Sequence, residues 1–172
     1  MSDTDLVPVL DELLEQVVQA LADVCAPVRV ATLETGLPAW DWCCEGHAFI
    51  RAPAVYPSNQ FPQQTIRTGN CTIGTAVQIE VGVLRCAPSM QDNADAPDSE
   101  DVSATSRQVY YDAQVVKDVL DGFEIAGGRR ANLILGGWEP YDVEGGCAGG
   151  FWQAWIDPTL CVPPCTSPSD EG

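Results

Sequence analysis

Residues 71–86 carry the clearest strand pattern in the sequence, and such a strand commits the chain to a β-sheet. One face of this strand is apolar and consists of Val77, Ile79, Val81 and Val83. The other face is polar or small and consists of Gln78, Glu80 and Gly82. A strand with one buried face and one wetter face is typical of an antiparallel sheet. We therefore expect a mainly antiparallel sheet.

Three further segments are predicted as strands, at residues 47–55, 131–138 and 150–157. The last of them contains Phe151, Trp152 and Trp155, and aromatic side chains favour sheet packing. A glycine-rich segment at 144–150 separates the last two strands. It predicts a hairpin turn, because glycine adopts positive φ without strain.

Two amphipathic helices are predicted from apolar residues at helical spacing. The stripe of the first helix, residues 5–25, consists of Leu10, Leu14, Val17, Leu21 and Val24. The stripe of the second helix, residues 107–123, consists of Val109, Ala113, Val116, Leu120 and Phe123. Ser106 is the expected N-cap of the second helix. Residues 28–45 show neither pattern and are predicted to be a linker.

The element order α-β-β-α-β-β predicts an α+β fold, in which two helices pack on the sheet and long loops connect the elements. A chain of 172 residues is close to the usual size of one domain, which we place at residues 1–157. An exposed acidic loop is predicted at residues 89–104, which contain Asp92, Asp95, Asp98, Glu100 and Asp101. Residues 158–172 are rich in proline and are predicted to form an irregular C-terminal arm.

The composition is strongly acidic, with 25 Asp and Glu against 8 Lys and Arg and a formal net charge of −17 at pH 7. Affinity for nucleic acids comes mostly from Lys and Arg that neutralise phosphates, so the charge argues against a protein that grips duplex DNA. The sequence has no apolar run of membrane-spanning length and no signal-peptide pattern at its start. We expect a soluble protein made in the cytosol, with no membrane partner.

The sequence offers few groups for catalysis. Its one histidine, His47, lies in a predicted strand, where a structural imidazole is favoured over a general base. No serine stands in a Gly-x-Ser-x-Gly elbow, and the glycine-rich turn lacks the lysine of a P-loop. We therefore predict no catalytic residue, no cofactor and no enzymatic activity.

The cysteines leave three interpretations open. There are eight, at positions 25, 43, 44, 71, 86, 147, 161 and 165, without regular spacing. Free or buried thiols are favoured, and disulfides are the alternative. A metal site is the least favoured interpretation, because only Cys161 and Cys165 approach the spacing of a zinc knuckle. The acidic loop lacks the central glycine and closing glutamate of an EF-hand, so no metal is predicted.

Tryptophan and arginine supply the candidate binding residues, because both are enriched where proteins contact each other. The candidates for a subunit interface are Trp40, Trp42, Arg51, Arg85, Arg129, Arg130, Trp138 and Trp152. We expect Arg51 and Arg85, near the ends of two strands, to pair with carboxylates of a neighbouring subunit. The alternatives are core packing for the tryptophans and solvated surface positions for the arginines.

Several local strings carry a family resemblance. They are GHAFIR at 46–51, YPS at 56–58, QIEVGVLRCAP at 78–88, GGW at 136–138 and GGCAGGFW at 145–152. Together with the first helix and the element order, they resemble the tail terminators and related head-to-tail joining proteins of long-tailed bacteriophages that infect actinobacteria. The resemblance extends over residues 5–157.

This resemblance implies a structural virion protein in the tail or neck, assembled in the host cytoplasm. Its subunits form a hexameric ring that caps the tail tube, stops tail polymerisation and joins the tail to the head. The implied partners are other copies of the chain, the major tail tube protein and a head-tail connector or stopper protein. Genomic DNA would pass through the lumen without sequence-specific binding, and acids lining that lumen would repel it.

Two alternatives stay open. The first is another neck component, either a head completion or stopper protein or a tail-tube-like subunit. The second belongs to a different class and is a small binding module stapled by disulfides. The eight cysteines, the acidic loop and the proline-rich arm all depart from the family pattern.

Overall fold

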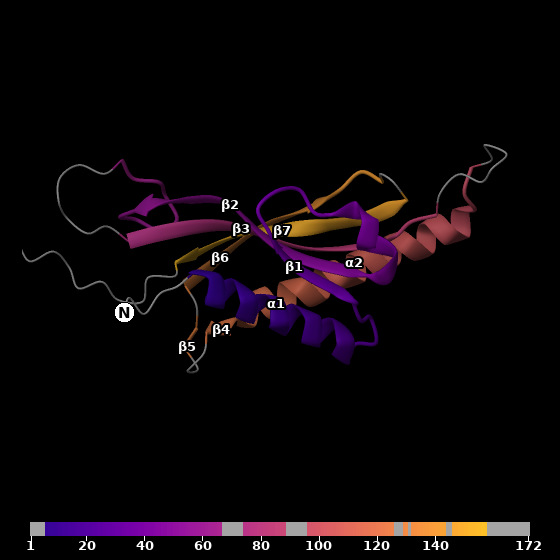
Figure 1. Ribbon diagram of the computed structural model, residues 1–172, viewed down its shortest axis with the longest axis horizontal. Helices are drawn as coiled ribbons and strands as arrows, with labels where there is room; N and C mark the ends of the chain where they lie inside the picture. The colour runs from indigo at the N-terminus through magenta and orange to yellow at the C-terminus, as the bar shows by residue number, and fades with distance from the viewer. Residues whose placement is uncertain are drawn as a thin grey trace, which may run out of the picture.

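A five-stranded sheet forms the centre of the computed structural model, which describes residues 6–66, 74–88, 96–125, 129–130, 132–143 and 146–157 (Figure 1). The strand order is β1-β2-β3-β7-β6. The strands are β1 (Val30–Glu34), β2 (His47–Ser58), β3 (Gly74–Cys86), β6 (Asn132–Pro140) and β7 (Cys147–Asp157). Two short strands, β4 (Glu124–Ile125) and β5 (Arg129–Arg130), pair separately. The predicted α+β fold with a mainly antiparallel sheet is confirmed.

The strand with the clearest sequence pattern, β3, lies in the middle of the sheet. It pairs with β2 on one side and with β7 on the other, antiparallel in both cases. The strand β1 is the exception, because it runs parallel to β2. A parallel pair needs a crossover connection, and the chain provides one in residues 35–46, which contain the 3₁₀ helix η1 (Trp40–Glu45).

Both α-helices cover the same face of the sheet (Figure 1). In α1 (Leu6–Asp23), the buried stripe consists of Val9, Leu10, Leu13, Leu14, Val17 and Leu21. In α2 (Ser99–Gly122), it includes Val109, Ala113, Val116 and Leu120. The stripe of α1, together with Val116 and Leu120 of α2, packs on Ile50, Ile79, Val81 and Ile156 of the sheet. Val109 packs instead on Ala87 and Ala148. Burial of each such aliphatic side chain stabilises the fold by about 1.5–3 kcal/mol.

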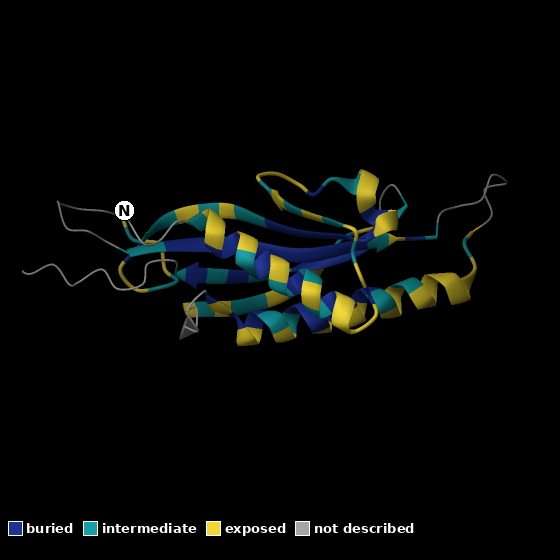
Figure 2. Ribbon diagram, turned by 60° about the horizontal axis from the view of Figure 1, so that its bottom comes forward, coloured by how far each residue is buried: buried dark blue, intermediate teal, exposed yellow. Residues whose placement is uncertain are grey.

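The helix α2 begins at Ser99, eight residues before the predicted start at 107, so the acidic-loop prediction for 89–104 is wrong at 99–104. Its N-cap is Asp98 and not Ser106, because the Asp98 carboxylate accepts a hydrogen bond from the Glu100 amide at 2.8 Å. The first turns extend past the sheet and are exposed (Figure 2), so they carry no long apolar stripe. Residues 89–95 lie outside the described part of the chain.

The linker predicted at 28–45 is also wrong, since this segment contains β1 and η1. Trp40 and Trp42 therefore lie on a 3₁₀ turn and not on an extended chain. The remaining predicted elements are correct in type but differ at their ends. In particular, β7 begins at Cys147, so the second half of the predicted glycine-rich turn is strand. The predicted arm at 158–172 lies outside the described residues.

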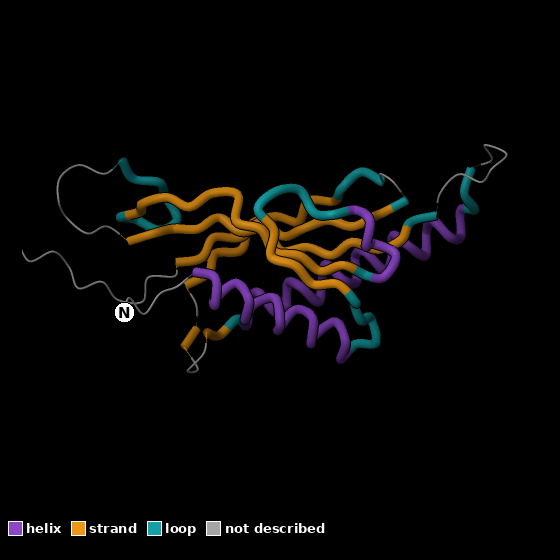
Figure 3. The backbone as a smooth tube through the Cα atoms, in the orientation of Figure 1, coloured by secondary structure: helices purple, strands orange, loops and turns teal. Residues whose placement is uncertain are grey.

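The polar face of β3 is not wet, which corrects the expectation for residues 71–86. Glu80 is 6% exposed, and Gly82 is also buried. The reason is that β3 is central and the loop bearing η1 arches over the side of the sheet away from the helices (Figure 3). The alternation in the sequence therefore reflects two differently covered faces: the helices cover the apolar face of β3, and the η1 loop covers its polar face.

Two disulfides fasten this loop to the sheet. Adjacent cysteines of η1 bond to different strands: Cys43 to Cys147 at the start of β7, and Cys44 to Cys86 at the end of β3. Cys86 and Cys147 are themselves direct partners in the β3–β7 register. For these four residues the structure has the disulfide alternative and not the favoured thiols. Loop-closure entropy assigns each bond about 4–5 kcal/mol of stabilisation.

The other cysteines divide into one described residue and three undescribed ones. Cys25, which follows α1, is exposed and has a free thiol. Cys71, Cys161 and Cys165 lie outside the described residues.

Arg85, near the end of β3, connects both helices to the sheet. Its Nε and Nη2 donate to the two carboxylate oxygens of Asp112 in α2, at 2.7 and 3.1 Å. Its Nη2 and Nη1 also donate to the carbonyl oxygens of Ala26 and Pro27, which follow α1, at 2.7 and 2.8 Å. Asp112 is only 1% exposed, so this bidentate pair neutralises a buried charge.

We expect Arg85→Met to destabilise the protein by about 3–5 kcal/mol, because the buried Asp112 carboxylate loses its counter-charge. The measurement is the free energy of unfolding in urea. The double variant Arg85→Met, Asp112→Leu should recover much of the loss, since it leaves no unpaired charge. Lys117→Met, which removes an exposed ion pair with Asp121, is the matched control and should change stability little. Equal losses in the Arg85 and Lys117 variants would contradict this role.

Candidate functional site

An aromatic cluster lies beneath the η1 loop, on the face of the sheet that the helices leave uncovered. We call it the aromatic cap, and it consists of Trp40, Phe49, Tyr141 and Phe151. The ring of Tyr141 is central to it, with centroid distances of 5.1 Å to Trp40, 5.2 Å to Phe151 and 6.3 Å to Phe49. Burial raises the pKa of Tyr141 to about 12, so its hydroxyl stays protonated at neutral pH.

One glycine makes room for this cluster. Gly82 of β3 lies opposite Phe49 of β2 in one register and opposite Phe151 of β7 in the other. A Cβ at position 82 would approach the Phe49 ring to 2.5 Å and the Gly150 carbonyl oxygen to 2.4 Å. Two phenylalanine rings therefore flank a backbone position that has no side chain, and a larger residue there would displace them.

An ion pair borders the aromatic cap. The Nε of Arg51 in β2 donates to a carboxylate oxygen of Glu80 in β3, and its Nη1 donates to the carbonyl oxygen of Gly36 at 3.3 Å. The guanidinium also lies 5.9 Å from the centroid of the Phe151 ring. Arg51 thus holds the start of the η1 loop against the sheet by polar contacts, at Glu80, whereas the disulfides hold the loop covalently six residues further along β3.

His47 belongs to a small buried network with β1. Its Nε2 lies 2.6 Å from the Thr32 hydroxyl and 3.3 Å from a carboxylate oxygen of Glu34. The Thr32 hydroxyl donates to the same Glu34 oxygen at 2.6 Å, so it accepts from His47 and the imidazole proton is on Nε2. Burial lowers the pKa of His47 below 6.5, while the Glu34 charge acts in the opposite direction.

This network joins β1 to β2. The His47 side chain is fully buried, beneath the exposed Trp42 ring, whose centroid is 5.7 Å away. A Thr-His-Glu grouping resembles a nucleophile relay in composition, but a general base must exchange its proton with the reacting groups, and this imidazole is closed to solvent. Here the three side chains form a polar contact between two adjacent strands.

The structure brings together three of the eight residues that the sequence suggested for an interface. Trp40, Trp42 and Arg51 all lie at or beside the aromatic cap, and Trp42 is 43% exposed. Trp138 and Trp152 lie together on the helix-covered face, with ring centroids 5.9 Å apart. The Trp152 indole donates to the Ala113 carbonyl of α2 at 2.7 Å.

Two of the four arginine candidates have partners within the chain, and the side chains of the other two lie outside the described part. Arg51 and Arg85 pair with Glu80 and Asp112 of the same subunit. The backbones of Arg129 and Arg130 form β5, and their side chains are outside the described part. A role of any of the eight residues between subunits remains a prediction.

Sequence reasoning missed several residues around the aromatic cap: Thr32, Glu34, Glu80 and Tyr141. Thr32 and Glu34 were in the presumed linker, and Glu80 was on the presumed wet face. A threonine and a glutamate two residues apart in a five-residue strand give no periodic signal. Only the pairing of β1 with β2 places them beside His47.

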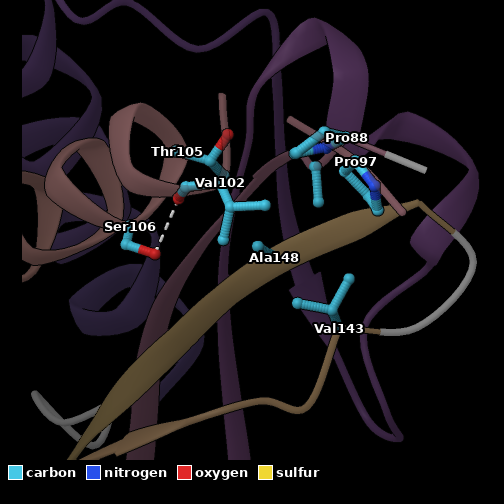
Figure 4. Close-up of a pocket in the computed structure, with 8 residues that line it drawn as sticks. Pro88, Pro97, Val102, Thr105, Ser106, Val143 and Ala148 are labelled. Carbon is cyan, nitrogen blue, oxygen red and sulfur yellow. Dashed lines mark hydrogen bonds between the residues drawn. The ribbon is translucent and has the colours of Figure 1, made fainter. Parts of the chain in front are cut away.

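A pocket of about 230 Å³ lies on the helix-covered face of the sheet, below the first turns of α2 (Figure 4). Its lining is Ala87, Pro88, Pro97, Val102, Thr105, Ser106, Val143 and Ala148. The Ser106 hydroxyl donates to the Val102 carbonyl at 2.9 Å, within the helix. Among the described residues, no ionisable side chain lines this pocket. These residues therefore offer packing contacts and no group for proton transfer.

The described residues contain neither a metal-binding cluster nor a membrane-spanning helix. No group of three or more His, Cys, Asp or Glu side chains there is placed to hold a metal ion. Neither helix of the described chain combines the length and apolarity needed to cross a membrane.

Comparison with known proteins assigns no family. No protein-family model matches the chain, and no curated protein is significantly similar to it.

The buried imidazole predicts a pH dependence of stability. Its pKa is lowered in the folded state and returns to about 6.5 on unfolding, so below about pH 6.5 the unfolded chain binds more protons. The contribution of His47 is therefore complete above that pH and is lost as the pH falls below it. We expect the free energy of unfolding to decline by up to about 1.4 kcal/mol per pH unit relative to His47→Gln. Urea unfolding between about pH 7 and 5 measures this difference; parallel curves for the two proteins would contradict it.

Proposed function

We propose that this chain is a structural virion protein whose copies form a ring that caps the tail tube of a long-tailed bacteriophage. In this function the ring stops tail polymerisation, joins the tail to the head or neck, and lets the genome pass through its lumen. The observation that carries the proposal is the distribution of charge over the described surface.

Exposed carboxylates lie on both α-helices, on η1, on β4 and β6 and in the loops. The exposed acids are Asp11, Glu15, Asp23, Asp41, Glu45, Asp98, Glu100, Asp101, Asp118, Asp121, Glu124, Glu139 and Asp142. Three of the few cations, Arg51, Arg85 and Lys117, are held in ion pairs within the chain. Such a surface repels phosphate, and a conduit that must release DNA benefits from that repulsion.

A ring also requires one patch of the subunit to meet a different patch on its neighbour. The two outer strands of the sheet, β1 and β6, lie at opposite edges and have different sequences. The exposed Trp42 beside the aromatic cap supplies an aromatic group of the kind enriched at interfaces. These features are compatible with head-to-tail association.

The proposal predicts a particle of about six times 18.4 kDa in the presence of tail tubes, measured by native mass spectrometry. Deleting the gene from the phage should give tails of irregular length that do not join to heads, as seen by electron microscopy. Tails of normal length on filled heads in the deletion strain would refute the proposal.

The two disulfides favour a second candidate, a disulfide-stapled binding module. Disulfides persist in oxidising compartments and are rare in reducing cytosol, where the virion proteins of a phage assemble. The oxidation state of the cysteines in the protein as it is produced therefore distinguishes the two candidate functions.

Thiol titration of the denatured, unreduced protein should find at most four of the eight cysteines reactive, because Cys43, Cys44, Cys86 and Cys147 are bonded. Reduction should then raise the count to eight. Eight reactive thiols before reduction would remove the stapled binding module from consideration. Protein recovered from phage particles is the informative sample, since it has passed through the host cytoplasm.

A further inference from the structure

We propose that the groove between α1 and the open edge of β1 binds an extended segment of a partner protein, in which every second residue is apolar or basic and these residues share one face. The segment lies along β1 as an added strand of the sheet. This site does not depend on the proposed ring, but a bound segment would cover the β1 edge and keep that edge from ring contacts.

The first observation is an open strand edge. β1 is the outermost strand of the sheet, and among the described residues it pairs with β2 alone. The backbone groups on its other side therefore point away from the sheet. Extended peptides recognise such an edge through main-chain hydrogen bonds, whereas their alternate side chains determine specificity.

The second observation is a groove along that edge. α1 and β1 lie side by side (Figure 1), and between them is a groove of about 580 Å³. Its lining is Asp11, Leu14, Glu15, Val18, Gln19 and Ala31. Leu14 and Val18 form an apolar floor, and Ala31 is exposed on the β1 side. Leu33, two residues further along β1 and so on the same face, is 38% exposed.

The apolar floor and the strand edge together fit every second side chain of an added strand. Side chains of a strand alternate between its two faces, so those on the helix side would enter the groove over Leu14 and Val18. A strand without apolar residues at alternate positions would leave this floor in contact with water. The site therefore selects a periodic segment.

The third observation is charge. Asp11 and Glu15 are exposed on successive turns of α1 at the groove, and no basic residue is part of the described lining. A net charge of −17 also disfavours acidic partners at long range. Lys or Arg at helix-facing positions on either side of the apolar ones would pair with Asp11 and Glu15, and the long stems of these side chains suit the edge of an apolar groove. These charges indicate a basic partner.

The probe for this site is a fluorescein-labelled peptide of about seven residues with blocked termini. Lysine and valine occupy every second position, with threonine between them, so that lysine and valine share one face of the added strand. Fluorescence anisotropy with the full chain should show saturable binding. The variant Asp11→Lys, Glu15→Lys should weaken binding at least about tenfold. The matched control Asp118→Lys, Glu139→Lys makes the same change of net charge on α2 and β6 and should change affinity less than about twofold. Circular dichroism verifies that both variants fold.

Two further peptides separate strand addition from simple charge attraction. A peptide with the same side chains but N-methylated at alternate backbone amides keeps its charge and loses donors to the β1 edge. It should bind at least about tenfold more weakly. The same peptide with glutamate in place of each lysine should not bind. Equal binding of the methylated peptide, or equal weakening by both charge variants, would overturn the proposal.

Other outcomes would identify a different occupant. If the peptide fails to bind the wild type but the Asp11→Lys, Glu15→Lys variant dissociates an oligomer, the groove is covered by a second copy and the proposal is wrong. No binding by a wild-type monomer would overturn it as well. If the wild type binds the peptide but forms no ring with tail tubes, the proposed function is refuted and this inference stands.

Discussion

The carboxylate of Asp112 is the constraint around which the two layers are arranged. It is almost completely buried between α2 and the sheet, where an unpaired charge would be strongly unfavourable. Arg85 neutralises it from β3 and uses its remaining donors on the carbonyls that follow α1. One side chain therefore fixes the position of both helices on the same strand.

The uncovered face is organised differently. There a loop and not a helix closes the sheet, and loops contribute little apolar surface of their own. The protein compensates with two disulfides from adjacent cysteines, the ion pair between Arg51 and Glu80, and the aromatic cap. The result is a firm platform beside Trp42, with an acidic surface around it. Both proposed functions, ring subunit and binding module, need such a surface to present a partner site without rearrangement.

Sequence patterns predicted the parts of this fold that depend on periodic burial. The stripes of α1 and α2 and the alternation of β3 were sufficient for the fold class and for most elements. They failed where burial is not periodic. β1 is too short to show a pattern, and the first turns of α2 have no sheet to pack on. η1 is held on the sheet by its two disulfides and not by an apolar stripe.

The functional regions were less predictable for the same reason. Trp40, Trp42 and Arg51 could be chosen by residue type, but Glu34, Glu80 and Tyr141 join them only through tertiary contacts. Asp112 looks like any exposed acid of a helix until its position against Arg85 is known. The groove beside β1 depends on a strand that was not predicted from the sequence. Only the acids of the groove, Asp11 and Glu15, lie on a predicted element, α1.

The position of β7 has a consequence for how the molecule is made. It is the last strand of the described chain, yet it lies between β3 and β6 and not at an edge. During synthesis, the sheet therefore stays in two parts until its final strand emerges from the ribosome. The bond between Cys44 and Cys86 can close early, whereas that between Cys43 and Cys147 must wait for β7. Completion of the sheet is thus a single late event, and a nascent chain stopped before residue 147 would lack an interior strand and not an edge strand.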